Sequence, residues 1–178
     1  VRDNINGLIW EIKQNKDDIE DYTNPNDADN DYTWYNSNYA TNGGFAGYVN
    51  NGKNTEAVIA LLNESKFGGF SDWRIPTLKE LFFIVDIRTF EPAFSEYFPS
   101  TRRSTYWSST TGKDYASLLD TDYGKRESYR KDYQRLVRAV RGGDSQALGK
   151  FVVNGDGTVT DINAGLMWNQ KTDDGTLT

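Results

Sequence analysis

The segment from Asp120 to Tyr133 mixes aromatic rings with basic side chains, the residue types that proteins use to hold acidic sugars. Rings stack on the apolar faces of pyranoses, while guanidinium and ammonium groups pair with sulfate or carboxylate. Surface charge runs are commonly inert, so an ordinary solvated hairpin is the alternative interpretation. The candidate ligand-binding residues are Tyr123, Lys125, Arg126, Tyr129, Arg130, Lys131 and Tyr133.

A second candidate site lies in the segment Asp17–Asp31, which carries acidic side chains and no basic one. Its hard oxygen ligands have the composition of a Ca²⁺ site, but the spacing lacks the central glycine and closing glutamate of an EF-hand. The sequence therefore leaves two interpretations open, a calcium site and a solvated loop of Asx turns. The candidate metal ligands are Asn26, Asp27, Asp29 and Asp31.

Composition excludes several kinds of chemistry. The 178 residues contain no Cys and no His, which excludes disulfides and cysteine nucleophiles and removes the commonest general base. A net charge of −6 argues against nucleic-acid binding, because phosphate contact needs a basic footprint. No run of about 18 apolar residues is present to insert into a membrane. We therefore expect a non-enzymatic domain, with an enzyme as the weakest alternative.

Apolar spacing predicts two helices ahead of the candidate binding segment. The first is capped by Asn54 or Thr55 and stopped by the glycine pair at 68–69. The second begins at Thr77, which has capping-box spacing to Glu80. Their apolar stripes are Ala57, Val58, Leu61 and Leu62 in the first, and Leu78, Leu81, Phe82 and Val85 in the second.

Strands are predicted at Gly7–Trp10, Tyr106–Ser109, Tyr115–Thr121 and Gln134–Arg141. We expect the first and last of these to close a twisted antiparallel sheet, which gives an α+β fold class with two helices. Ahead of the second helix, we expect Trp73 to be a core ring and Arg74 to bond loop carbonyls.

The opening pattern VRDNINGLIWEIK, at Val1–Lys13, returns as VTDINAGLMWNQK at Val159–Lys171. The offset is too long for a solenoid repeat, so the recurring unit is a whole domain. We expect a module at 1–143, a linker at 144–150 and the start of a second copy at 151–178. In the second copy, FVV and TVT flank an Asp-Gly turn and predict a hairpin. The first copy is expected to lack the matching first strand.

Four motifs occur in order along the chain: GLIW at 7–10, GGFSDWRIPTLKEL at 68–81, YWSST at 106–110 and RLVRAVRGG at 135–143. Through them the chain resembles the Lcl C-terminal-domain-like family of bacterial exported proteins. The resemblance implies a C-type-lectin-like fold, related to the formylglycine-generating sulfatase-modifying fold, in surface or secreted modules, some of which bind sulfated glycosaminoglycans. The oxidase branch of that wider fold needs a cysteine-based copper site, so its activity does not carry over to this chain.

These observations give two hypotheses of different classes. In the first, a secreted or cell-surface module binds an extracellular glycan or protein ligand through Tyr123–Tyr133, with acidic glycans the favoured class and Ca²⁺ a possible cofactor. In the second, the module is a structural subunit of a tandem array or surface filament. Its segment Phe151–Lys171 then completes a neighbouring copy, since open sheet edges recruit strands.

Overall fold

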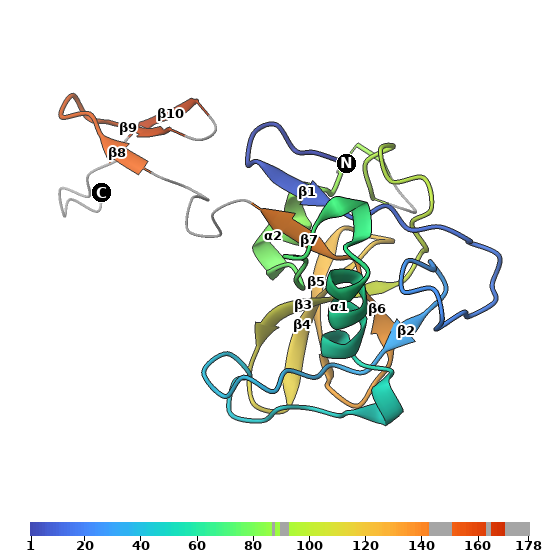
Figure 1. Ribbon diagram of the computed structural model, residues 1–178. Helices are drawn as coiled ribbons and strands as arrows, with labels where there is room; N and C mark the ends of the chain where they lie inside the picture. Colours follow the sequence, from blue (N-terminus) through green and yellow to red (C-terminus); the bar gives the residue numbers. More distant parts are fainter. Residues whose placement is uncertain (87, 90–92, 143–150, 163–164, 170–178) are drawn as a thin grey trace.

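The computed structural model describes residues 1–86, 88–89, 93–142, 151–162 and 165–169 (Figure 1). Its helices are α1 (Thr55–Glu64) and α2 (Leu78–Phe83), with 3-10 turns η1 (Asn50–Gly52) and η2 (Phe67–Gly69). Its strands are β1 (Leu8–Trp10), β2 (Asp31–Tyr32), β3 (Thr105–Thr111), β4 (Tyr115–Asp120), β5 (Lys125–Arg130), β6 (Arg135–Leu136), β7 (Val140–Gly142), β8 (Phe151–Val153), β9 (Thr158–Asp161) and β10 (Leu166–Asn169). Neither helix in these ranges is long and apolar enough to cross a membrane.

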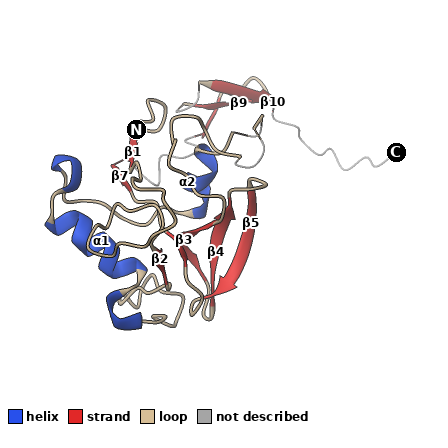
Figure 2. Ribbon diagram, turned by 90° about the vertical axis from the view of Figure 1, so that its right-hand side faces the viewer, coloured by secondary structure: helices blue, strands red, loops and turns tan. Residues whose placement is uncertain are grey.

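The strands form three sheets. The central sheet has the order β2-β6-β3-β4-β5, with β5 at its outer edge (Figure 2), and β3 and β6 are its one parallel pair within the described residues. A second sheet pairs β1 with β7, and a third has the order β10-β9-β8. The predicted α+β class is confirmed, as is the hairpin formed by FVV and TVT.

The predicted closure by the terminal strands is confirmed only in part: β1 and β7 pair antiparallel, but they form a separate two-stranded sheet and do not close the central one. The segment Gln134–Arg141 does not form one strand: it divides into β6, which joins the central sheet, and β7, which pairs with the N-terminal strand. The residues between them, 137–139, are buried, and Arg138 bonds other segments there. The predicted linker, 144–150, lies outside the described residues, as do 170–178 of the predicted second copy.

Both helices begin where the sequence predicts a cap. The Asn54 side chain accepts a hydrogen bond from Ala57 N at 2.9 Å, and Thr77 and Glu80 make both bonds of a capping box. The predicted apolar stripe of α2 is partly wrong, because Phe82 is 39% exposed whereas Glu80 is fully buried. The helix therefore directs a carboxylate into the protein.

Hydrophobic cores lie on both faces of the central sheet. Successive residues of a strand point to opposite faces, and β3 uses this alternation to bury two adjacent rings. Tyr106 stacks on Phe94 at 6.0 Å between ring centroids, on the side where Leu81 of α2 packs. Trp107 joins the other core, which includes Val58 of α1. The two helices therefore stabilise opposite faces of one sheet.

The buried carboxylate of Glu80 holds the signature segment in place. Arg74 donates to it through both terminal nitrogens, at 2.6 and 2.8 Å, and Thr77 N donates at 2.7 Å. Burial alone would raise the pKa of Glu80, but the bonds from Arg74 and Thr77 outweigh it and leave that pKa below its usual value. Trp73 is a core ring as predicted, whereas the main partner of Arg74 is this carboxylate and not loop carbonyls.

The Glu80→Gln substitution is expected to lower the free energy of unfolding by about 1.5–3 kcal/mol at neutral pH, because Arg74 and Thr77 lose their charge-assisted hydrogen bonds to the carboxylate. The folded-state pKa of Glu80 is depressed, so its ionic contribution is complete above the unfolded pKa and is lost as the pH falls through the folded pKa. Urea unfolding at neutral and acidic pH should therefore show wild type and variant converging in acid.

The matched control is Asp72→Asn, which removes an ion pair with Arg141 in which the aspartate is 54% exposed. Exposed pairs contribute little, so this variant should stay close to wild type at every pH. A loss at Glu80→Gln that is the same in acid and at neutral pH would contradict the assigned role of the ionised carboxylate.

Candidate functional site

The predicted ligand-binding residues do not form one surface. Most of them belong to β5, and successive residues of a strand point to opposite faces of its sheet. Register pairs Tyr129 with Ala116, in the core that contains α1, and Arg126 with Leu119, in the core that contains α2. Residues directly opposite in antiparallel strands share a face. Lys125 and Tyr129 therefore lie on one face of the sheet, and Arg126 and Arg130 lie on the other.

Lys131 is wrongly placed by the sequence prediction, because its side chain is completely buried. Its ammonium donates to the carbonyls of Asn42 and Phe45, at 2.8 and 2.7 Å, and lies 4.2 Å from the centroid of the Trp34 ring. Burial lowers the pKa of Lys131, with Asp114 acting in the opposite direction. Lys131 therefore anchors the loop at 42–45 and cannot contact an external ligand.

Acidic neighbours neutralise two of the remaining predicted cations. Lys125 lies 3.0 Å from Glu127 and 3.6 Å from Asp120, and Arg130 lies 2.7 Å from Asp132. These pairs raise the pKa of both basic groups, chiefly through the side-chain hydrogen bonds. Their charge is therefore less available to an anionic ligand than the sequence alone indicates.

The strongest combination of rings and charge lies where β5 turns into β6. Tyr129 and Tyr133 contact edge to face, with ring centroids 5.8 Å apart. The guanidinium carbon of Arg135 lies 4.4 Å from the Tyr129 centroid and 5.4 Å from that of Tyr133. Arg135 makes no ion pair with a carboxylate among the described residues. We call Tyr129, Tyr133 and Arg135 the tyrosine–arginine surface.

Arg135 was missing from the predicted set because it follows the ring-rich segment and falls in a predicted strand. The signal that could have found it is spacing: Tyr133 and Arg135 are two residues apart, so they share a side of an extended chain.

Tyr123 and Lys125 also contact each other, with the Lys125 ammonium 5.0 Å from the centroid of the Tyr123 ring, but at the other end of β5. Lys125 and Tyr129 are four positions apart, which is about 13 Å along a strand.

A second ring and cation adjoin the tyrosine–arginine surface through β2. Arg135 lies directly across from Tyr32, and Tyr22 packs edge to face on Tyr32 with centroids 5.7 Å apart. The ammonium of Lys53 lies 3.8 Å above the Tyr22 ring. Lys53 is exposed and, within the described residues, pairs with no carboxylate. Tyr22 and Tyr129 thus pack against the core that contains Val58 of α1, and the cations Lys53 and Arg135 lie over their rings.

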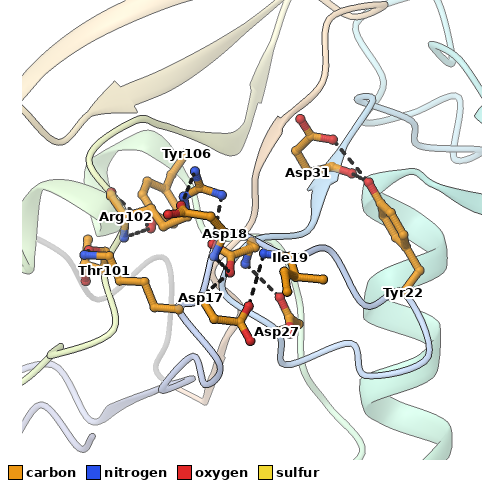
Figure 3. Close-up of polar contacts among 11 residues, drawn as sticks. Asp17, Asp18, Ile19, Tyr22, Asp27, Asp31, Thr101, Arg102 and Tyr106 are labelled. Carbon is orange, nitrogen blue, oxygen red and sulfur yellow. Dashed lines mark hydrogen bonds and ion pairs between the residues drawn. The ribbon is translucent and has the colours of Figure 1, made fainter.

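The candidate calcium residues belong to a loop that Arg102 holds against the protein (Figure 3). Arg102 lies 2.8 Å from Asp29 and 3.3 Å from Asp18. Asp29 also accepts hydrogen bonds from Asp17 N and Asp18 N, both at 2.8 Å. The loop is therefore ordered by its own carboxylates, as the Asx-turn interpretation expects.

Two other candidate ligands, Asp27 and Asp31, also have partners. Asp27 accepts a bond from Asp29 N at 2.8 Å, and Asp31 accepts from Gln134 and from the Tyr22 hydroxyl. Both polar side-chain atoms of Asn26 are buried without a protein partner. In the ranges that the structure covers, no three acidic side chains gather to hold a metal ion. Calcium at Asn26, Asp27, Asp29 and Asp31 stays a prediction.

A cavity of about 600 Å³ is lined by other residues, among them Trp34, Glu56 and Arg74. Concave apolar spaces of this size are the usual place to look for a small ligand. Arg74 is paired with Glu80, while Glu56 adds negative charge and accepts a bond from Ser37 N at 2.7 Å. The cavity therefore does not suit an acidic ligand.

Comparison with protein families matches the Lcl C-terminal domain to residues 1–141. The chain belongs to the Lcl C-terminal domain family. Comparison with curated proteins and with solved structures found no match. The matched region ends within β7, so the tyrosine–arginine surface lies inside the Lcl C-terminal domain and β8–β10 lie beyond it.

In this Lcl C-terminal domain, Lys131→Met is expected to lower the free energy of unfolding by about 1–3 kcal/mol, because two carbonyls lose their buried donor. Urea unfolding measures the loss. Arg130→Met, on the neighbouring exposed residue, is the control and should change stability little. Equal stability of Lys131→Met and wild type would contradict the anchoring role.

Calcium binding by the loop is tested by thermal melting in excess calcium chloride and in EDTA. A bound ion stabilises the folded state by mass action, so binding at the predicted residues would raise the melting temperature in calcium. Asp27→Asn should then reduce the rise. Identical melting in calcium and EDTA would reject the calcium prediction.

Proposed function

We propose that this Lcl C-terminal domain is a non-catalytic extracellular binding module for acidic glycans, with the tyrosine–arginine surface as its site. The observation that carries the proposal is the guanidinium of Arg135, stacked on two tyrosines and without a carboxylate partner in the described part of the chain. In a complex, the tyrosines would stack on a pyranose while Arg135 makes paired hydrogen bonds to sulfate or carboxylate.

Lys53 supports the same ligand class by adding a second uncompensated charge beyond β2. A polymer with repeated anionic groups can engage two separated cations, whereas a small anion engages one. With a net charge of −6, the protein as a whole repels an acidic polymer. Binding of such a polymer therefore needs a local group of cations such as Arg135 and Lys53. We therefore expect an acidic glycan to bind at this site and not over the whole protein surface.

Family membership supports two finer proposals. We propose a C-type-lectin-like arrangement, on the ground that β1 pairs with β7 near the two ends of the matched region and that two helices cover the central sheet. We also propose a secreted or cell-surface location in a bacterium, which fits a binding module for extracellular glycans.

Arg135→Gln is expected to weaken binding to a sulfated glycosaminoglycan oligosaccharide by about tenfold or more, because a charge-assisted pair is lost. Isothermal titration calorimetry measures the dissociation constant. The same affinity should fall as salt is added, since exposed ion pairs are screened. Tyr133→Ser should also weaken binding by removing one stacking ring.

Arg126→Gln is the matched control, because it removes the same charge from the opposite face of β5. It should leave the dissociation constant close to that of wild type. If Arg126→Gln weakens binding as much as Arg135→Gln does, the tyrosine–arginine surface is not the site. Absence of binding to any acidic glycan would reject the proposed function itself.

A further inference from the structure

The cavity of about 600 Å³ lies beside the N-terminal half of α1, and we call it the α1 cavity. Its walls come from four parts of the chain: the loop at 34–41, the start of α1, the segment 74–77 ahead of α2, and Ser109 of β3. Its volume is in the range of sites that take small ligands. The tyrosine–arginine surface shares no residue with this lining, so the two places are separate.

One face of α1 gives the cavity both an apolar wall and a carboxylate. Glu56 and Ile59 line it and are three residues apart, so they lie side by side on the helix. Ile59 and Ile75 pack against the core that contains Val58 but are only partly buried. Their remaining apolar surface therefore faces the same space as the carboxylate of Glu56.

Hydrogen bonds hold the loop at 34–41 against this face of α1. The Thr55 hydroxyl donates to Tyr35 O at 2.7 Å and accepts from Tyr35 N at 2.9 Å. Ser37 N donates to Glu56 Oε2 at 2.7 Å. The wall is fixed by these bonds, which lowers the ordering cost of binding a ligand.

Glu56 is the one charged side chain of the lining without an oppositely charged partner among the described residues. A carboxylate has about four acceptor positions, so the bond from Ser37 leaves Oε1 open to another donor. The other charge of the lining, Arg74, is neutralised by its paired bonds to Glu80. The start of α1 carries about half a positive charge, which does not cancel the full charge of Glu56.

The buried ammonium of Lys131 also lies near, because it contacts the Trp34 ring. Lys131 is not part of the lining, however, and Asp114 is its acidic neighbour. The charge that a ligand meets inside the α1 cavity is therefore that of Glu56.

We propose that the α1 cavity binds an organic cation, a primary ammonium group on a short apolar stem. The ammonium donates to Glu56 Oε1, and the stem packs on Ile59 and Ile75. Charge-assisted hydrogen bonding supplies orientation, and burial of the stem supplies affinity. A free alkylamine and the lysine side chain of a partner protein both carry this group.

NMR titration of the full chain with n-butylammonium chloride, at constant ionic strength, tests the proposal. Saturable shift changes are expected at the methyl groups of Ile59 and Ile75. The neutral isostere n-butanol should bind about threefold more weakly or worse, because it lacks the charge. Methylammonium keeps the charge but lacks most of the stem, so it should bind about tenfold more weakly or worse.

Glu56→Gln should weaken binding of n-butylammonium by about threefold or more and leave n-butanol unchanged. The variant keeps an oxygen that can accept the bond from Ser37, so the loop should stay in place. Glu64→Gln is the matched control, because it removes the same charge from the other end of α1, where the residue is exposed and does not line the cavity. It should bind n-butylammonium as wild type does.

Equal affinities of wild type for n-butylammonium and n-butanol would overturn the proposal. An equal loss in Glu56→Gln and Glu64→Gln would also overturn it, because attraction to the acidic protein as a whole would then explain binding. A tripeptide Ala-Lys-Ala with both ends blocked distinguishes the two sources of the ammonium group. Binding at least as tight as that of n-butylammonium identifies a lysine of a partner protein, and weaker binding identifies a free amine.

Discussion

A buried polar junction between the residues that follow β1 and the segment 137–139 determines how the rest of the module is arranged. The Glu11 carboxylate accepts a bond from Ala139 N at 2.7 Å and lies 2.9 Å from the ammonium of Lys13. The Arg138 guanidinium donates to the Glu11 carbonyl and to the Thr101 hydroxyl, at 2.8 and 2.9 Å. Burial lowers the pKa of Lys13, and the nearby carboxylate opposes that shift. Buried charges of this kind are tolerated only when their partners stay in place, so the junction fixes the strand order around it.

The junction also explains where the candidate binding residues lie. Because Arg138 turns inward at residues 137–139, the last segment divides, and β6 brings Arg135 into the central sheet beside Tyr129. The same reversal of the chain after β5 buries Lys131 on Trp34. Cations that are close in sequence therefore differ in their partners: Lys131 anchors a loop, Lys125 and Arg130 pair with acids, and Arg135 has no carboxylate partner among the described residues.

Local signals in the sequence were sufficient for the helices but not for the sheet. The Asn54 cap and the Thr77–Glu80 capping box act within one turn, so residue type and spacing predict them. β5 carries alternating polar residues at a sheet edge and has no apolar pattern to reveal it as a strand. Without that strand, the alternation that separates Arg126 from Tyr129 could not be predicted. The inward course of Lys131 depends on carbonyls far away in the chain, which no local pattern encodes.

The claim that the tyrosine–arginine surface holds the ligand is tested most directly by NMR. Backbone and side-chain chemical shifts of the full chain would be followed while a sulfated glycosaminoglycan oligosaccharide is added. We predict that shifts change at Tyr129, Tyr133 and Arg135, with smaller changes near Tyr22 and Lys53, while Arg126 on the opposite face stays unchanged. Changes centred on Arg126 and Arg130, with the tyrosine–arginine surface unaffected, would contradict this account.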